Sequence, residues 1–357
     1  MKICFVVGTL ARGGAEKQLV FMLRALKKLG IAAEVLCLTK GESYEDEITD
    51  AGFNVKWIGT SKNRLSRLSN IIGELRAMGA DIIQSSHFYT NIYAGAAGKV
   101  LRMPSIGAIR SDLVYEIKGH KFTGKWQISL PSLLIANSEG ARLRLIERGV
   151  ARQKVEFVRN VVEIENGAAN GPSHQGLKIL FAGRLDKNKR PERFVRLAAI
   201  LTEQFPHLGL QFQIAGDGEQ RSVLENTANE LNLSSDKLQF FGACGQMSDI
   251  YRRADILVST SEREGTPNVV LEAMAHGLPV VATKAGGTTE ILDATRGFLV
   301  TPGDGDALVK ATAELILNKD LRVRFGAEGR RYVRENHSFE SLQNHLYEIY
   351  QRLLSTI

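Results

Sequence analysis

Two glutamates flank the start of a predicted helix in the stretch EGTPNVVLEAMAHGLPVV, which runs from residue 264 to residue 281. If Glu264 and Glu272 both lay in this helix, about 12 Å would separate them along its axis. Glu264 precedes Pro267, however, and therefore belongs to the loop, so the chain can fold back and bring both carboxylates and the free N–H groups of the helix around one polar ligand. A carboxylate accepts two hydroxyl donors at once, which a ribose or a sugar diol offers. The alternative is that Glu264 only interacts with the helix dipole and that Glu272 is a solvated helix residue.

A basic loop with the sequence GRLDKNKRPERF, at residues 183–194, is the second candidate site. It follows a predicted strand and precedes a predicted helix that begins at Pro191, a favoured first helical residue. Arg184 would hold a diphosphate through paired donors, and Lys189 would act on it as a point charge. An ordinary solvated surface loop carries charges of this kind too, so both interpretations stand.

A loop with two adjacent glycines, GTLARGGAEK, occupies residues 8–17. Gly13 and Gly14 allow backbone N–H groups to approach a ligand closely, and the N-terminus of the helix that follows favours an anion. The spacing is not G-x-G-x-x-G, and a tight turn explains the two glycines nearly as well.

Strands alternating with helices must position these loops. Apolar runs typical of buried parallel strands end at each loop, and helical patterns of about 10–15 residues lie between them. Strands are predicted over residues 1–9, 33–39, 80–86, 133–138, 177–183, 210–216, 238–242, 254–260 and 278–283. This alternation predicts parallel α/β sheets with right-handed crossovers.

The segment EIENGAANGPSHQG at residues 163–176 separates two such runs and lacks apolar periodicity, which is typical of a linker. We therefore predict an α/β protein with two Rossmann-like, doubly wound parallel-sheet domains that face each other across a cleft. The first domain is expected over residues 1–165 and the second over residues 175–337. A C-terminal helix over residues 338–357 is expected to pack back toward the first domain. In such sheets ligands bind beyond the carboxyl ends of the strands.

The stretch at residues 264–281 resembles the signature E-G-x-P-N-x-x-L-E-A-x-A-x-G-x-P-V-V-A of the retaining glycosyltransferases of family 4, which have the GT-B fold. Further matches occur in the right order over nearly all 357 residues. They are GGAE, ANSEG, FAGRL..NK.P, IAGDGEQR..LE, FFG, ADILVSTSEREG and AGGTTEIL.

The resemblance implies roles for the candidate residues. Arg184 and Lys189 would bind the diphosphate of a nucleotide sugar and stabilise it as it leaves. Glu264 would face the donor sugar, Glu272 would bind the ribose hydroxyls, and Gly14 would line the diphosphate from the N-terminal side. The turn whose amides meet the sugar and the phosphates would consist of Gly265, Thr266, Pro267, Asn268 and Val269.

The resemblance also places the nucleotide base near Gly216 and Phe241. At one position the chain departs from the family, because many relatives carry a histidine close to the reacting centre where this chain has Arg110. An arginine there would hold a phosphate or the acceptor. His87 follows the end of a predicted strand and is a candidate for facing the ligand, although a structural role explains it equally well.

Positive charge is concentrated in the first half of the chain. Residues 1–170 hold 24 Lys and Arg against 16 Asp and Glu, a balance of +8, and the remainder holds 22 against 23, a balance of −1, which together give the formal net charge of +7. This asymmetry suggests an anionic partner such as a phosphorylated lipid, a membrane face or a nucleic acid, and a merely solubilising surface is the alternative.

Two basic segments of the first half are candidates for contact with an anionic membrane. RLSRLSNIIGELRAM at residues 64–78 predicts an amphipathic helix with arginines beside its apolar face, and KGHKFTGKW at residues 118–126 is basic and ends in Trp126. Membrane contact would favour a lipid-linked acceptor. Packing of the helix on the sheet is the alternative explanation. With the resemblance to glycosyltransferases, we expect no nucleic-acid partner.

The expected function is that of a retaining, hexosyl-type glycosyltransferase for polysaccharide or cell-envelope biosynthesis. The donor would be a nucleotide-diphosphate sugar, with a UDP-sugar favoured by the family alone, and the acceptor a glycan or a lipid-linked glycan. We expect no cofactor and no metal, since fixed cations and amides can stabilise the leaving diphosphate and the only Asp-x-Asp, at residues 304–306, is predicted to be a loop. A nucleotide-sugar 2-epimerase of the same architecture and a non-catalytic nucleotide-sugar-binding protein are the alternatives.

The expected location is the cytoplasm, with peripheral attachment to the inner membrane face as an extension of the membrane hypothesis. The apolar run at residues 3–7 is too short for a signal peptide, and no stretch approaches the roughly 18 apolar residues of a membrane span. Three cysteines without metal-ligand spacing predict reduced thiols.

Overall fold

The structure, a computed structural model, describes residues 1–60, 63–120, 123–164 and 176–355. The chain forms two compact units. The N-terminal unit comprises Met1–Val161 and Phe339–Ile357, and the C-terminal unit comprises Val162–Ser338. Most of the segment predicted as a linker, residues 163–176, lies outside the described residues.

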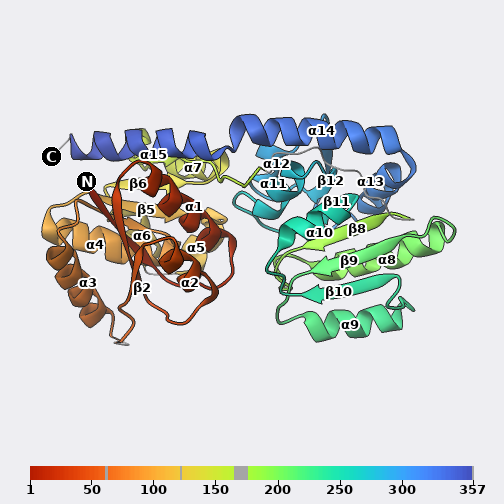
Figure 1. The fold of residues 1–357 in the computed structure, drawn as a ribbon, viewed down its shortest axis with the longest axis horizontal. Helices are drawn as coiled ribbons and strands as arrows, with labels where there is room; N and C mark the ends of the chain where they lie inside the picture. The colour runs from red at the N-terminus through yellow and green to blue at the C-terminus, as the bar shows by residue number, and fades with distance from the viewer. Residues whose placement is uncertain (61–62, 121–122, 165–175, 356–357) are drawn as a thin grey trace. The chain divides into compact units, whose positions relative to one another are not determined.

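The N-terminal unit is built on a seven-stranded sheet with the order β3-β2-β1-β4-β5-β6-β7 and parallel pairing throughout (Figure 1). Its strands are β1 (Lys2–Val7), β2 (Ala32–Cys37), β3 (Asn54–Trp57), β4 (Ile82–Ser85), β5 (Ser105–Ile109), β6 (Leu133–Ala136) and β7 (Val155–Phe157). Its helices are α1 (Gly14–Lys28), α2 (Ser43–Asp50), α3 (Arg64–Met78), α4 (Asn91–Leu101), α5 (Leu113–Gly119), α6 (Gly124–Ser129), α7 (Glu139–Glu147) and α15 (Phe339–Leu354), with short 3-10 turns at Phe88–Thr90 and Arg152–Lys154.

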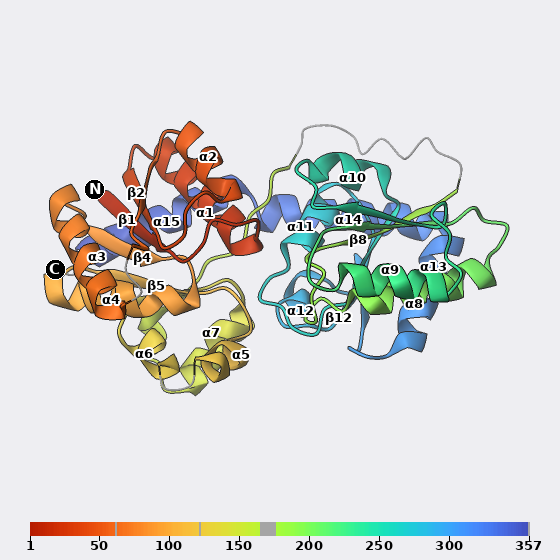
Figure 2. The same ribbon diagram turned by 90° about the horizontal axis from the view of Figure 1, so that it is seen from below.

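Both faces of this sheet are buried, which is why β1 reads as a continuous apolar run. Ile3 and Phe5 point to one face, where they pack with α1 and with the buried side of α15. Cys4 and Val6 point to the other face, where they pack with α3 and α4. Figure 2 shows α15 beside α1, although more than 300 positions separate the two helices in the sequence.

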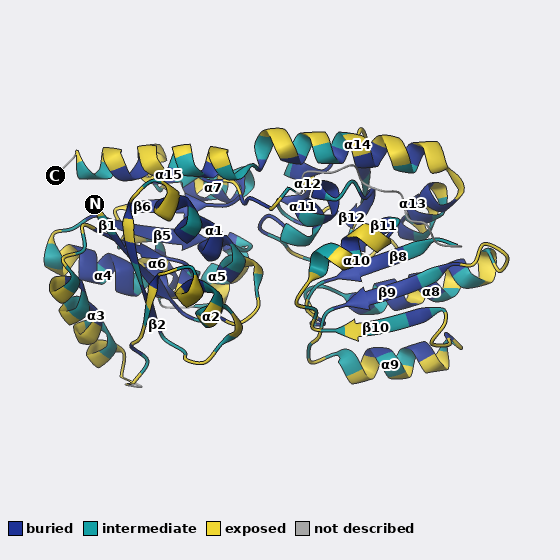
Figure 3. Ribbon diagram, viewed as in Figure 1, coloured by how far each residue is buried: buried dark blue, intermediate teal, exposed yellow. Residues whose placement is uncertain are grey.

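The C-terminal unit repeats the design with six parallel strands in the order β10-β9-β8-β11-β12-β13. Its strands are β8 (Lys178–Ala182), β9 (Gln211–Ala215), β10 (Leu238–Gly242), β11 (Ile256–Ser259), β12 (Val280–Thr283) and β13 (Gly297–Val300). Its helices are α8 (Pro191–Gln204), α9 (Arg221–Glu230), α10 (Met247–Arg253), α11 (Asn268–Ala275), α12 (Thr288–Ile291), α13 (Gly305–Leu317) and α14 (Lys319–Asn336). The central strands of both units are buried, and α3, α9 and α14 each show an exposed side (Figure 3).

The predicted α/β class and the two parallel-sheet domains are confirmed, and each predicted strand is present with bounds shifted by at most a few residues. Four strands lacked a clear signal because they are short or contain glycine: β3, β5, β7 and β13. The C-terminal helix predicted over residues 338–357 is present over its described residues as α15.

Each sheet reverses its strand order at one point, between β1 and β4 in the N-terminal unit and between β8 and β11 in the C-terminal unit. A crevice forms outside the carboxyl ends of the strands at such a switch point, because the loops on either side lead away in opposite directions. The glycine loop at residues 8–13 follows β1, the basic loop at residues 183–190 follows β8, and the loop with Glu264 follows β11. The topology therefore places all three candidate loops at switch points.

Candidate functional site

The loops that follow β8 and β11 meet in a direct ion pair. Lys189 Nζ lies 2.5 Å from Glu264 Oε1, although 75 positions separate the two residues in the sequence. Their side chains are 22% and 10% exposed. Attraction between partly buried charges is stronger than between charges in water, because less solvent screens them. The basic loop and the glutamate loop, two separate predictions from the sequence, thus form one site.

Hydrogen bonds hold the two loops together behind this ion pair. The Glu262 amide donates to the Asn188 carbonyl at 2.8 Å, and the Asn188 side chain donates to the Arg263 carbonyl at 2.9 Å. The buried Thr260 hydroxyl donates to the Lys189 carbonyl at 2.8 Å. These contacts fix the backbone on both sides of Lys189, so its ammonium group is positioned in advance of any ligand.

The cations of the basic loop differ in how far the protein neutralises them. Glu262 forms ion pairs with Arg190 at 3.3 Å and with Arg193. Arg184 is exposed, and no described residue forms an ion pair or a side-chain hydrogen bond with it. Its guanidinium group is therefore open to an anionic ligand at the carboxyl end of β8.

Glu272 lies in α11 and is oriented by a buried tyrosine. The Tyr251 hydroxyl donates to Glu272 Oε2 at 2.8 Å. Burial, and after it the nearby charge of Glu272, raises the pKa of Tyr251 well above its ordinary value, so the phenol stays protonated and remains a donor. Beside them, His276 Nδ1 lies 2.8 Å from the Glu272 carbonyl and His276 Nε2 lies 3.0 Å from Ser248 Oγ. Because a carbonyl only accepts, Nδ1 carries a proton and donates it to the Glu272 carbonyl.

A glycine turn supports the Glu264 loop through its backbone. The Gly287 amide donates to the Gly265 carbonyl at 2.8 Å. Gly286 has a φ of +50°, and a Cβ atom there would lie 1.9 Å from the Glu264 carbonyl oxygen. Only glycine fits this close approach, so the turn at residues 285–287 determines where the Glu264 backbone lies.

The predicted binding turn is a turn only in part: Gly265, Thr266 and Pro267 precede α11, whereas Asn268 and Val269 are the first two residues of that helix. Glu264 lies in the loop and Glu272 in the helix, as the sequence predicts. Pro267 is the N-cap and not the first helical residue, and the Val270 amide donates to its carbonyl at 3.2 Å. The positive end of the helix dipole thus lies next to Glu264, where it favours negative charge on a ligand.

The residues predicted near the nucleotide base are joined by backbone contacts. The Gly216 amide donates to the Gly242 carbonyl at 2.8 Å. Gly216 has a φ of +152°, and a Cβ atom there would lie 1.8 Å from the Gly183 carbonyl oxygen. Phe241 beside this contact is 43% exposed. The ends of β8, β9 and β10 therefore lie close together, and an aromatic ring there is open to stacking.

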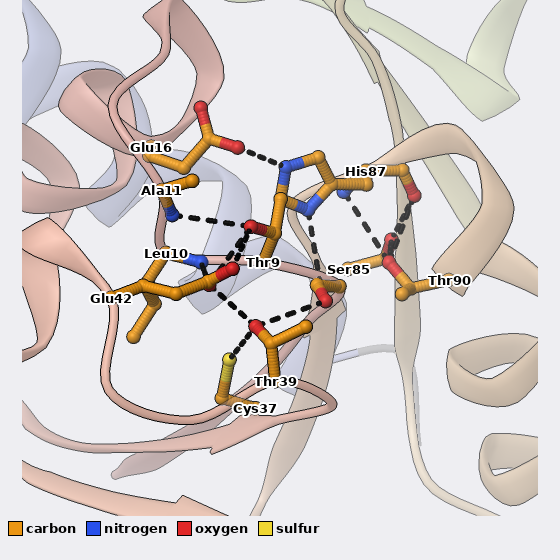
Figure 4. Close-up of polar contacts among 11 residues, drawn as sticks. Thr9, Leu10, Ala11, Glu16, Cys37, Thr39, Glu42, Ser85, His87 and Thr90 are labelled. Carbon is orange, nitrogen blue, oxygen red and sulfur yellow. Dashed lines mark hydrogen bonds and ion pairs between the residues drawn. The ribbon is translucent and has the colours of Figure 1, made fainter. Parts of the chain in front are cut away.

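His87 is held in one tautomer at the switch point of the N-terminal unit (Figure 4). The Gly8 amide donates to His87 Nδ1 at 3.2 Å, and His87 Nε2 lies 2.9 Å from Glu16 Oε1. Because Nδ1 accepts, Nε2 carries the proton and donates it to the carboxylate. The Tyr89 ring stacks on the imidazole with 5.4 Å between ring centroids. His87 thus connects the start of the glycine loop at Gly8 with the first turn of α1 at Glu16.

Glu42 clamps the same loop from the other side, as Figure 4 shows. Its carboxylate accepts from the Thr9 hydroxyl at 2.8 Å, from the Leu10 amide and from the Thr39 hydroxyl at 2.5 Å. Burial alone would raise the pKa of Glu42, but the hydrogen bonds from Thr39, Leu10 and Thr9 outweigh burial and lower it. The carboxylate therefore stays charged and holds the loop at neutral pH.

Gly13 and Gly14 lie where α1 begins, with Gly13 as the N-cap. A Cβ atom on Gly13 would lie 2.2 Å from Glu16 Oε2, so a larger residue there would make the Glu16 carboxylate move. Glu16 lies in the first turn of α1, where a negative charge interacts favourably with the helix dipole. The helix N-terminus thus already has one anionic neighbour within the protein.

Arg110 follows β5, with the guanidinium group partly buried. Its Nη1 donates to Asn160 Oδ1 at 3.3 Å and its Nη2 to Met22 Sδ at 3.5 Å. Burial lowers the pKa of Arg110 to about 10, against a smaller opposing effect of Tyr350, so the side chain remains charged at neutral pH. The residue at the position of the family histidine is therefore a cation surrounded by neutral groups.

Tyr251, Glu42 and Glu16 are parts of these sites that the sequence did not reveal. Glu16 and Glu42 look like ordinary charged surface residues, and Tyr251 looks like a residue of an amphipathic helix. A signal was present only for Glu16, which is in the quoted motif GGAE.

No group of three or more His, Cys, Asp or Glu side chains suited to a metal ion occurs within the described ranges. Residues 304–306, predicted as a loop, are instead the start of α13, and this prediction is corrected. The Asp304 carboxylate caps the helix by accepting from the Ala307 amide at 2.9 Å. The three cysteines are all free thiols, as predicted.

The amphipathic helix predicted at residues 64–78 is α3, and most of its apolar face packs on the sheet. Ile71 and Leu75 are buried against β1 and β4, and Leu68 and Ile72 are partly buried there, whereas Leu65 is 75% exposed. Trp126 of the second basic segment is exposed in α6, and residues 121–122 of that segment lie outside the described residues. Across the described parts of the chain, no helix has the length and apolar character needed to cross a membrane.

Two family models match consecutive parts of the chain. The model described as Glycosyltransferase Family 4 matches residues 12–166, and the model described as Glycosyl transferases group 1 matches residues 163–332.

Curated relatives are similar over different lengths. One relative is the Campylobacter jejuni GalNAc-alpha-(1->4)-GalNAc-alpha-(1->3)-diNAcBac-PP-undecaprenol alpha-1,4-N-acetyl-D-galactosaminyltransferase. It is 29% identical over 331 residues, which cover 90% of this chain and 90% of that protein. The putative glycosyltransferase EpsD of Bacillus subtilis is 33% identical over 154 residues, which cover 43% of this chain and only 40% of EpsD.

Among solved structures, Anabaena HepE in complex with UDP-glucose matches 99% of this chain and 100% of that chain, with a TM-score of 0.86 and 20% identity. At this identity the likeness shows the fold, and it confirms the predicted GT-B architecture of two parallel-sheet α/β domains.

Proposed function

Because the chain belongs to the glycosyltransferases of family 4 and group 1, whose models together match residues 12–332, we propose that it transfers a sugar from a UDP-sugar with retention of anomeric configuration and without a metal. The acceptor in this proposal is a glycan or a lipid-linked glycan. The matched models are glycosyltransferase models, which favours transfer over the alternatives of a 2-epimerase or a non-catalytic binding protein.

The contact between Lys189 and Glu264 is the observation that carries the proposal. It brings a cation for the diphosphate and a carboxylate for the sugar hydroxyls within 2.5 Å of each other at the switch point of the C-terminal sheet. Glu272, oriented by Tyr251, is the second carboxylate for a diol. These groups suit a donor that has a sugar, a diphosphate and a ribose.

The proposed reaction uses these groups. The acceptor hydroxyl oxygen forms a bond to the anomeric carbon while the bond from that carbon to the diphosphate oxygen breaks. The acceptor proton passes to the departing phosphate oxygen on the same face of the sugar, so the configuration is retained. Lys189 and Arg184 stabilise the charge that grows on the diphosphate, and the amide end of α11 adds its dipole. UDP is proposed as the leaving group because HepE, a protein of the same fold, binds UDP-glucose.

A lipid-linked acceptor is proposed on two grounds. The Campylobacter jejuni relative, similar over 90% of this chain, has a PP-undecaprenol saccharide in its name. The excess of positive charge in residues 1–170 suits an anionic partner. Peripheral contact with an anionic membrane from the cytoplasmic side, in cell-envelope polysaccharide synthesis, is a consequence of this proposal. Binding to anionic vesicles at low salt, lost at high salt, is the expected result of a sedimentation assay.

The proposal is tested with the full chain and a panel of UDP-, GDP- and ADP-sugars. We expect a thermal shift with UDP-sugars, slow release of UDP in the absence of acceptor, and a product whose anomeric proton coupling shows retention. Activity should persist in EDTA. Activity that EDTA abolishes and Mg²⁺ restores would contradict the metal-independent mechanism, and inversion at the anomeric carbon would contradict the same-face transfer.

A further inference from the structure

Among the described residues of the N-terminal unit, Arg110 has no counter-ion. Its two hydrogen-bond acceptors, Asn160 Oδ1 and Met22 Sδ, are neutral, and no carboxylate of the described chain forms an ion pair with it. Tyr350, its electrostatic neighbour, is a buried phenol whose pKa burial raises, so it is neutral as well. Partly buried charges are normally paired, because removing them from water is unfavourable. The described residues therefore leave this cation without a charged partner.

Unused hydrogen-bonding groups lie at the carboxyl ends of two neighbouring strands here. Arg110 Nε follows β5 and Ser86 Oγ follows β4, and within the described residues both atoms are buried and have no hydrogen-bond partner. Met22 Sδ accepts from Arg110 and also from the Gln84 side chain at 3.6 Å, so Arg110 and the side chain of Gln84 on β4 lie on the same face of the sheet. A buried polar atom without a partner is uncommon and calls for a ligand or water.

We propose that Arg110 binds a phosphoryl group of the acceptor. This inference rests on the proposed function and names the class of acceptor, a phosphorylated or diphosphoryl-linked glycan as opposed to a neutral one. A guanidinium group binds phosphate oxygens through paired donors, and the phosphate supplies the missing negative charge. A neutral glycan would leave the cation unpaired.

The first test is calorimetric titration of the full chain with inorganic pyrophosphate in the presence of saturating UDP. The wild-type chain should bind pyrophosphate while UDP occupies its own site, and Arg110→Gln should weaken that binding at least about tenfold without changing the affinity for UDP. Arg102→Gln is the matched control, because it removes an exposed cation from the same unit. Wild-type pyrophosphate affinity in Arg110→Gln, or no pyrophosphate binding beside UDP, overturns the inference. Absence of UDP binding would instead contradict the proposed function.

The second test separates ligand binding from a structural role through the melting temperature. Arg110→Met removes a cation that has no counter-ion, so its melting temperature should equal or exceed that of the wild type. With UDP saturating in both samples, pyrophosphate should raise the melting temperature of the wild type and not that of Arg110→Met. A lower melting temperature together with an unchanged response to pyrophosphate shows a structural arginine and overturns the inference. If the neutral variants fail to fold, Arg110→Lys replaces them, because lysine keeps the charge but lacks the paired donors. This variant should bind pyrophosphate more weakly than the wild type. Equal binding would count against the inference.

Discussion

Replacing Lys189 with methionine separates the stability of the site from its catalysis. Lys189→Met leaves the Glu264 carboxylate, which is 10% exposed, without its cation. Exposed ion pairs contribute about 0–1 kcal/mol and breaking buried ones costs about 3–5 kcal/mol, so for this partly buried pair we expect a loss of about 1–3 kcal/mol. That loss lowers the melting temperature by roughly 3–10 °C for a unit of this size. Loss of a preorganised donor to the leaving diphosphate should lower kcat by about 10²–10³.

A double-mutant cycle with Glu264→Gln tests this reasoning. The Lys189→Met/Glu264→Gln protein has no unpaired charge, so most of the lost stability should return while kcat stays low. Melting temperature by calorimetry and the rate of UDP release are measured on the four proteins of the cycle. Lys187→Met is the control, since Lys187 is an exposed cation of the same loop without an ion pair in the described chain. Near-normal kcat in Lys189→Met, or recovery of kcat in the double mutant, would refute the assigned role.

Three further predictions concern groups that hold the sites in place. Tyr251→Phe removes a hydrogen bond to the Glu272 carboxylate, so calorimetry should show UDP affinity reduced at least about tenfold. Unchanged affinity would show that the phenol does not orient the carboxylate. Gly286→Ala would bring a methyl group to 1.9 Å from the carbonyl of the loop glutamate, so we expect lower kcat and lower melting temperature, while Gly305→Ala, whose Cβ meets nothing within 4 Å, should resemble the wild type. The folded-state pKa of Glu42 is lowered, so its contribution to stability is present above its ordinary pKa and is lost as pH falls through the lowered value. Glu42→Gln should therefore have a lower melting temperature than the wild type at about pH 7, and the difference should shrink as pH falls below the ordinary carboxyl range. A constant difference across that range would argue against the carboxylate as the clamp.

The alternation of apolar runs and helical patterns was enough to predict both sheets, because parallel strands buried on two faces need continuous apolar sequence. The prediction failed for short strands at the sheet edges and for β5, whose Ser and Gly weaken the apolar signal. It also failed at residues 304–306, because a helix cap and a loop both favour aspartate.

Arg184, Lys189 and Glu264 were chosen as candidates because their types suggest chemistry and they follow a strand, and their roles stay predictions. The sequence did not indicate which residues these candidates contact. Nothing in the local sequence of Lys189 indicates that Glu264, 75 positions later, is the carboxylate it contacts. Tyr251 was likewise hidden, because a buried tyrosine in a helix has the same pattern whether or not its hydroxyl faces a carboxylate.

The sequence by itself determined the class of fold, the order of the loops and the types of group available to a ligand, since these depend on local periodicity and on residues close in the chain. Only the tertiary structure decided which charges are neutralised within the protein and which remain for a ligand. Three examples are the pairing of Lys189 with Glu264, the clamp of Glu42 on the glycine loop and the lack of a counter-ion at Arg110 among the described residues. Each depends on distances between residues that are far apart in sequence. Such distances arise from strand order and crossover geometry, which bring the ends of separate strands to one edge of a sheet.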